Sequence, residues 1–180
     1  IGVFHYNNSY SGPTWFVSVD GDDLQGDGSI ENPFESIQAA INFSENGDSV
    51  DVSEGTYFEF VNTRYRQIDI VGRGMGSSII DGMNLGRPVL INNAVYFAGF
   101  TIQNANVVDP NDDRGGGMLI SGDGGATIEN CLFTDNYCAQ NGDHLKFGTG
   151  APNIIKNCIF QNNNSNNYPI HTDNGGQGAT

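Results

Sequence analysis

The sequence has few basic residues. Seven Lys and Arg stand against 21 Asp and Glu in 180 residues, which gives a formal net charge of −14. Nucleic acids and anionic membrane surfaces are bound through clustered positive charge, so we expect neither as a partner. The same excess of negative charge disfavours a polyanionic sugar as a substrate. An acidic surface is typical of proteins that stay soluble in salty water or that bind divalent cations.

Long apolar runs are also missing. No stretch is long enough to span a bilayer, so we expect no membrane insertion by this segment. The sequence starts at Ile1 without a recognisable signal peptide, and a signal peptide that had been removed would leave the same start. This feature therefore leaves secretion open.

Helical periodicity is scarce, whereas Gly (25 residues) and Asn are abundant. This composition predicts an all-β fold of many short strands joined by tight turns, and the length suits one folded unit. Residues 1–14 form a polar and aromatic lead-in. Residues 15–48 contain a strand at 15–19, an acidic loop and a helix, and residues 49–180 contain the remaining strands.

The helix is expected at 34–43, where apolar residues follow helical spacing. Phe34, Ile37, Ala40 and Ile41 would share one face. Beyond it the period changes to that of strands, interrupted by Gly, Asn or Asp. The expected strands lie at 50–52, 68–70, 78–80, 89–91, 95–97, 118–120, 145–147 and 154–155.

A motif at 125–136 recurs at 152–163, and a looser copy begins at Phe97. Successive copies are 31 and 27 residues apart, which suits one turn of a solenoid with a loop of variable length. The matched pairs are Asn130 and Asn157, Cys131 and Cys158, Phe133 and Phe160, Asn136 and Asn163, Met118 and Leu145, and Ile120 and Phe147. The chain stops at Thr180, where the next copy would begin, so we expect a truncated last turn and a longer parent chain.

Stacked turns would place like residues above one another at about 4.8 Å. Apolar ladders would fill the interior, and Asn residues would form amide ladders at the turns. The helix would cap the N-terminal end, where strand edges would otherwise be open. Of the three cysteines, Cys131 and Cys158 fall at equivalent positions. We interpret them as small core residues, with a disulfide as the alternative.

Three segments carry a resemblance to a known family. Residues 15–23, 28–40 and 47–57 resemble the N-terminal module of right-handed parallel β-helix proteins of the pectin-lyase-like superfamily, and the resemblance extends over about 15–180. It implies a right-handed parallel β-helix and an extracellular or cell-surface location. Such modules occur on lyases of alginate, chondroitin and pectate, and on surface proteins without known chemistry.

A second resemblance concerns the repeats. Residues 133–136 and 160–163, with Gly-Gly-Gly-Met at 115–118, resemble the Phe-x-x-Asn and Gly-Gly-Ala-Ile repeats of polymorphic outer-membrane adhesins. Met118 departs from the second pattern. This resemblance favours an adhesive role.

One candidate catalytic group lies on the strand at 145–147 and on its counterpart one turn later. Leu145 and Phe147 are expected to point inward, so His144, Lys146 and His171 would point outward. Asp143 and Asp173 flank them. In β-helix lyases, which the fold resembles, a basic residue on an outer sheet face removes the proton next to a uronate carboxyl. These three residues could then supply a base and an electrostatic stabiliser, or they are polar residues on a solvated face.

A candidate metal site lies in the acidic loop. Its possible calcium ligands are Asp20, Asp22, Asp23 and Asp27. Gln25 stands where an EF-hand needs Gly, so an ordinary solvated loop is the alternative. Asp109, Asp112 and Asp113 form a similar cluster with the same alternative.

The sequence thus predicts a non-catalytic β-helix segment of a larger secreted or cell-surface protein, acting as a stalk, an adhesin or a glycan-contacting surface. Its partners would be a polysaccharide or other surface glycan and the rest of its own chain. The alternative is a polysaccharide lyase that cleaves a uronate-containing glycan by β-elimination. A third hypothesis is a calcium-stabilised structural module.

Overall fold

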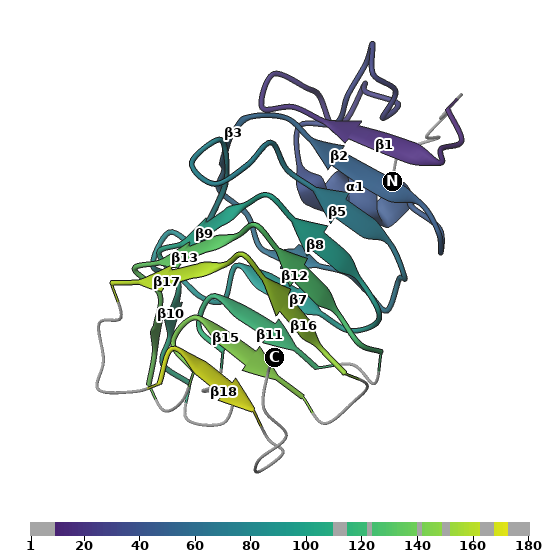
Figure 1. Ribbon diagram of the computed structural model, residues 1–180. Helices are drawn as coiled ribbons and strands as arrows, with labels where there is room; N and C mark the ends of the chain where they lie inside the picture. The colour runs from purple at the N-terminus through teal and green to yellow at the C-terminus, as the bar shows by residue number, and fades with distance from the viewer. Residues whose placement is uncertain are drawn as a thin grey trace.

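The computed structural model describes residues 10–109, 115–121, 124–139, 142–148, 152–162 and 168–172. Within these residues the chain forms a parallel β-solenoid of about four turns with a short helix at one end (Figure 1). The expected all-β solenoid with an N-terminal capping helix is confirmed. Residues 1–9 of the expected lead-in lie outside the described part.

Three parallel sheets run along the described part of the stack. The first contains, in order, β1 (Thr14–Val17), β2 (Ser49–Val52), β5 (Asp69–Val71), β8 (Tyr96–Ala98), β12 (Thr127–Glu129) and β16 (Ile154–Lys156). The second contains β4 (Val61–Asn62), β7 (Val89–Ile91), β11 (Met118–Ile120), β15 (Leu145–Phe147) and β18 (Ile170–Thr172). The third contains β3 (Gly55–Tyr57), β6 (Ser78–Asp81), β9 (Thr101–Gln103), β13 (Leu132–Thr134) and β17 (Ile159–Gln161). A short pair, β10 (Asn106–Val107) and β14 (Tyr137–Cys138), adds a further parallel contact.

The register agrees with the repeat. Phe133 of β13 lies opposite Phe160 of β17, and their rings stack with centroids 5.0 Å apart. The other expected matches are also neighbours across strands. They are Phe97, Ile128 and Ile155, then Ile102 and Phe133, then Met118 and Leu145, and Ile120 and Phe147. These residues form interior ladders, so hydrophobic burial holds the turns in register.

The corners of the turns use left-handed backbone. Gly99, Asn130 and Asn157 occupy equivalent corners with φ of 78°, 52° and 50°. Asn adopts this conformation more readily than most residues, which explains its recurrence. The side chains of Asn130 and Asn157 are exposed, and in the described residues no hydrogen bond joins them. The amide ladder expected between Asn130 and Asn157 is therefore absent. The second expected ladder would join Asn136 to Asn163, and Asn163 lies outside the described residues.

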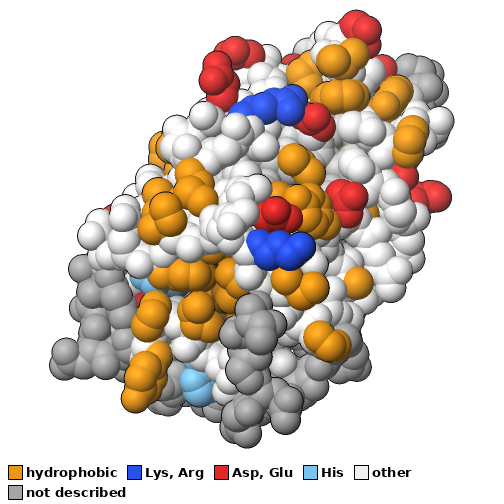
Figure 2. Space-filling model, viewed as in Figure 1, with side chains coloured by type: hydrophobic (Ala, Val, Ile, Leu, Met, Phe, Trp, Pro, Cys, Tyr) orange, Lys and Arg blue, Asp and Glu red, His pale blue; other side chains and the backbone are white. Residues whose placement is uncertain are grey.

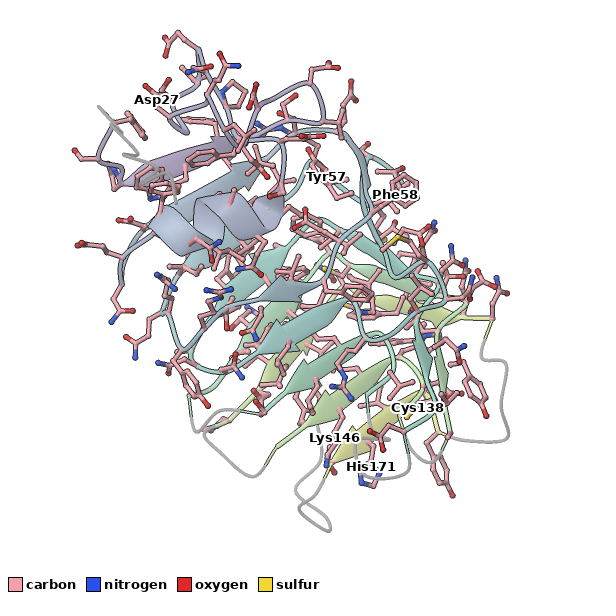
Figure 3. The ribbon with its side chains drawn as sticks, turned by 180° about the vertical axis from the view of Figure 1, so that it is seen from behind. Asp27, Tyr57, Phe58, Cys138, Lys146 and His171 are labelled. Carbon is pink, nitrogen blue, oxygen red and sulfur yellow. The ribbon has the colours of Figure 1, made fainter. Side chains whose placement is uncertain are left out.

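The helix α1 (Ile37–Phe43) covers the N-terminal end of the stack, across β1 and β2 (Figure 3). Ile37, Ala40 and Ile41 are fully buried beneath it. Phe43 stacks on Phe34 at a centroid distance of 5.0 Å, and Phe34 stacks on Trp15. Ile37, Ala40 and Ile41 form the expected buried face. The helix begins at Ile37 and not at the expected residue 34, because Ser36 is its N-cap and Phe34 lies before it, in a parallel bridge with Val17. In the described part of the chain no helix has the length and hydropathy needed to cross a bilayer.

Candidate functional site

His144 lies at an interior corner just before β15. It has no exposed surface, and its ring is 6.0 Å from that of Phe160. Burial lowers its pKa below the ordinary value, while the charges of Asp143 and Asp135 act in the opposite direction. The expectation that His144 faces outward is wrong, because the residue precedes the strand and its ring turns toward the next corner.

Asn136 holds this corner together. Its Oδ1 accepts from the backbone nitrogen of Ala105 at 3.0 Å, and its Nδ2 donates to the carbonyl of Ile102 at 2.9 Å. The same Nδ2 lies 3.2 Å from Nδ1 of His144. Asn136 is fully buried, so it supplies hydrogen bonds that the backbone of the previous turn would otherwise lack.

Asp143 is the third buried polar residue of the corner. Its Oδ1 accepts from the backbone nitrogen of Cys138 at 3.1 Å, and its side chain has no exposed surface. The carboxylate therefore ties β14 to the segment that leads into β15.

Lys146 and His171 meet as expected on the outer row of the second sheet. Lys146 of β15 is the direct cross-strand neighbour of His171 of β18, and Figure 3 shows both at the C-terminal end of the stack. Lys146 is only 6% exposed, however, and His171 is half-buried. The expectation of a solvated outer row is wrong for Lys146.

Two glycines explain this burial. A Cβ on Gly115 would come within 2.8 Å of Cβ of Lys146, and one on Gly142 within 2.9 Å of Cβ of His171. The two glycines are equivalent in the repeat and have φ of 68° and 72°. The segment before each strand therefore crosses closely over the outer residue of the next turn, which is possible only without a side chain.

The acidic loop is built from local hydrogen bonds. Oδ1 of Asp22 accepts from the backbone nitrogens of Leu24 and Gln25, at 2.7 Å and 3.0 Å. Oδ1 of Asp27 accepts from the backbone nitrogen of Ser29 at 3.0 Å. These contacts are turn contacts of Asx type.

Asp23 has a different task, because it holds Ser36, the N-cap residue of α1. Its Oδ1 accepts from the backbone nitrogens of Glu35 and Ser36, at 2.8 Å and 2.9 Å, and its Oδ2 accepts from Oγ of Ser36 at 2.6 Å. In the described residues no three His, Cys, Asp or Glu side chains, Asp20 included, converge as metal ligands would. Asp112 and Asp113 of the second acidic cluster lie outside the described residues.

A hollow of about 300 Å³ opens beside α1 and β3. Tyr57 and Phe58 line it with Glu35, and the ring of Phe58 is 64% exposed. Tyr57 points inward and donates from its hydroxyl to the carbonyl of Ser53 at 3.1 Å. Burial, followed by the charge of Glu59, raises the pKa of Tyr57 to about 12, so this phenol stays protonated at neutral pH.

Glu59 lines the same hollow, but its carboxylate is hydrogen-bonded to α1. Its two carboxylate oxygens accept from the backbone nitrogens of Ile37 and Gln38, at 2.8 Å and 2.9 Å. Burial raises its pKa despite these bonds. Glu59 therefore helps to hold α1 in place.

A second hollow of about 690 Å³ shares Val19 with the first. Asp20, Glu54 and Arg73 line it, and Arg73 forms an ion pair with Asp51. In the described residues the carboxylates of Glu54 and Glu35 have neither a hydrogen-bond partner nor an ion-pair partner. The two hollows together form a polar surface with one prominent aromatic ring, which we call the Phe58 surface.

The Phe58 surface was not predicted from the sequence. The sequence feature that could have indicated it is the aromatic-rich run from Tyr57 to Phe60. In the structure Tyr57 is buried, whereas Phe58 and Phe60 are exposed. An aromatic residue at an outward position beside Glu59 would have suggested a contact surface. No family model, curated protein or solved structure matches this chain.

Proposed function

We propose that the chain is a non-catalytic segment of a larger secreted or cell-surface protein, and that the Phe58 surface contacts a neutral glycan. The segment would belong to the pectin-lyase-like group of right-handed parallel β-helices and act as a stalk or an adhesin. The observation that carries this proposal is the exposed ring of Phe58 in the first hollow, beside the carboxylate of Glu35. The second hollow shares Val19 with the first and adds the carboxylate of Glu54.

Sugar recognition suits this chemistry. An exposed aromatic ring offers a flat apolar face, and a sugar ring has apolar C–H faces of similar size. The carboxylates of Glu35 and Glu54 accept hydrogen bonds from hydroxyl groups. The net charge of −14 disfavours an anionic glycan, so we assign a neutral one.

The last described strands are compatible with the proposed place in a longer chain. Among the described residues β16, β17 and β18 come last in their sheets, and another turn could pair with their outer edges. Ile154 and Ile159 are 40% and 49% exposed there. Figure 2 shows exposed apolar side chains at this end of the molecule as well as at the N-terminal end. A further turn of the same chain would bury them.

Binding to an array of neutral oligosaccharides tests the glycan proposal. We expect Phe58→Ala to weaken binding by about tenfold or more, because the ring supplies the apolar contact. Tyr168→Ala is the matched control, since Tyr168 is a 74% exposed aromatic residue at the other end of the stack. Retained binding by folded Phe58→Ala protein, or equal losses in both variants, would overturn the proposal.

A lyase is the second candidate, and the adjacency of Lys146 and His171 favours it. A base and a cation on neighbouring turns could act on one uronate residue. A lyase would require that the substrate reach Lys146, and this residue is only 6% exposed. We therefore rank it below glycan contact.

A further inference from the structure

Cys131 and Cys158 occupy the same corner of two neighbouring turns. The backbone pairs on both sides of them, because Asn130 donates to the carbonyl of Lys156 at 3.0 Å and Ile159 donates to the carbonyl of Cys131 at 2.9 Å. Neighbouring strands lie about 4.8 Å apart. This spacing falls within the range of Cα separations that a disulfide spans, roughly 4.4–6.8 Å.

The two side chains also share an orientation. Sγ of Cys131 contacts the carbonyl of Glu129 at 3.3 Å, and Sγ of Cys158 contacts the equivalent carbonyl of Lys156 at 3.2 Å. Sγ of Cys158 also reaches back to the carbonyl of Ile128 in the previous turn, at 3.6 Å. The Cys158 sulfur therefore leans toward the turn that carries Cys131.

The two thiols differ in exposure and acidity. Cys131 is fully buried, whereas Cys158 is partly exposed. The interaction with Cys131 lowers the pKa of Cys158 to about 7, whereas burial raises the pKa of Cys131. The accessible member of the pair is thus the better nucleophile near neutral pH. Both thiols are free in this structure.

We propose that Cys131 and Cys158 are a modification site, at which a disulfide links the last two described turns of the solenoid. The Cys158 thiolate attacks one sulfur of a small disulfide such as oxidised glutathione, forms a mixed disulfide and releases one glutathione thiolate. Cys131 then loses its proton and attacks Sγ of Cys158, which releases the second glutathione. Two thiols are oxidised and one oxidised glutathione is reduced. This inference does not depend on glycan binding.

The third cysteine provides an internal control. Cys138 is fully buried on β14, and its thiol belongs to a different corner. Oxidation of the pair should leave it reduced. The variant Cys138→Ser should therefore oxidise like the natural chain.

The test is to incubate the folded protein with oxidised glutathione and to analyse it by mass spectrometry and peptide mapping. We expect loss of two hydrogens, no retained glutathione and a linked peptide pair containing Cys131 and Cys158. The melting temperature should rise, and a reductant should reverse the change. Cys131→Ser should retain one glutathione on Cys158, because the resolving thiol is missing.

Three results would overturn the proposal. One is a stable glutathione adduct on Cys158 in the natural chain. Another is a link that involves Cys138. The third is no loss of thiols in the folded protein under conditions in which the unfolded chain reacts.

Discussion

Asn136 donates a hydrogen bond from Nδ2 to Nδ1 of His144 in a corner where neither side chain has exposed surface. The backbone fixes the direction of this bond. Ala105 donates to Oδ1 of Asn136 and the Ile102 carbonyl accepts from Nδ2, so the amide cannot be reversed. His144 is then neutral with its proton on Nε2.

Removing the Asn136 amide should destabilise the fold. In Asn136→Ala the backbone nitrogen of Ala105 loses its partner, and the carbonyl of Ile102 loses one hydrogen bond. We expect the free energy of unfolding to fall by about 3 kcal/mol, measured by chemical denaturation. Asn106→Ala is the matched control, because the Asn106 amide bonds at an exposed position. Equal effects of the two changes would contradict a bridging role for Asn136.

His144 should make the fold sensitive to acid. Its folded pKa is lowered, so above the unfolded value of about 6.5 the ring is neutral in both states and imposes no penalty. As the pH falls below that value, His144 becomes protonated in the unfolded chain but stays neutral in the folded protein. Stability should then fall by up to about 1.4 kcal/mol per pH unit.

The variant His144→Gln isolates this contribution. Unfolding measured at pH 7.5 and 5.5 should show a smaller loss in the variant than in the natural chain. The pKa of Glu59 is raised, so Glu59 favours the folded state at lower pH, but it is present in both proteins. The same pH dependence in both would show that His144 is not the titrating group.

The left-handed corners should tolerate Gly better than Ala. Asn130 has φ of 52° and an exposed side chain, so backbone conformation is the main constraint on this position. We expect Asn130→Ala to cost about 1 kcal/mol and Asn130→Gly to be close to neutral. Thermal unfolding of the two variants provides the comparison. A larger cost for Gly than for Ala would contradict the assignment.

Gly115 should be less tolerant of Ala than a glycine in open space. An added Cβ at Gly115 meets the carbonyl oxygen of Met118 at 2.5 Å and Cβ of Lys146 at 2.8 Å, whereas one at Gly47 meets nothing within 4 Å. Both glycines have positive φ, so Gly47→Ala measures backbone strain without a clash. We expect Gly115→Ala to cost about 1–3 kcal/mol more, measured by denaturant unfolding. Equal costs would show that the segment can move away from Lys146.

The repeat made most of the fold predictable from the sequence. The spacing of Phe133 and Phe160 gave the register of adjacent turns, because like residues stack in a parallel solenoid. The helical spacing of Ile37 and Ile41 gave the capping helix. The strands β3, β4, β10 and β14 were missed, because each has only two or three residues and so too short a pattern to detect.

The candidate site was harder to predict, because exposure depends on segments far along the chain. Alternation correctly placed Lys146 next to His171 on one row. It could not show that Gly115 passes over Lys146. Likewise, the sequence suggested the carboxylates of Asp22 and Asp23 as metal ligands, and it could not show that Oδ1 of each accepts hydrogen bonds from backbone nitrogens. Phe58 was overlooked because a single exposed ring has no periodic signal.

Binding and product formation on one panel of alginate, pectate, chondroitin and neutral glycans distinguish glycan contact from lyase activity. We expect that a neutral glycan binds, that Phe58→Ala loses this binding, and that no unsaturated oligosaccharide forms from any member of the panel. Unsaturated products that disappear in Lys146→Ala or His171→Ala protein would contradict this expectation. That result would identify the chain as part of a lyase.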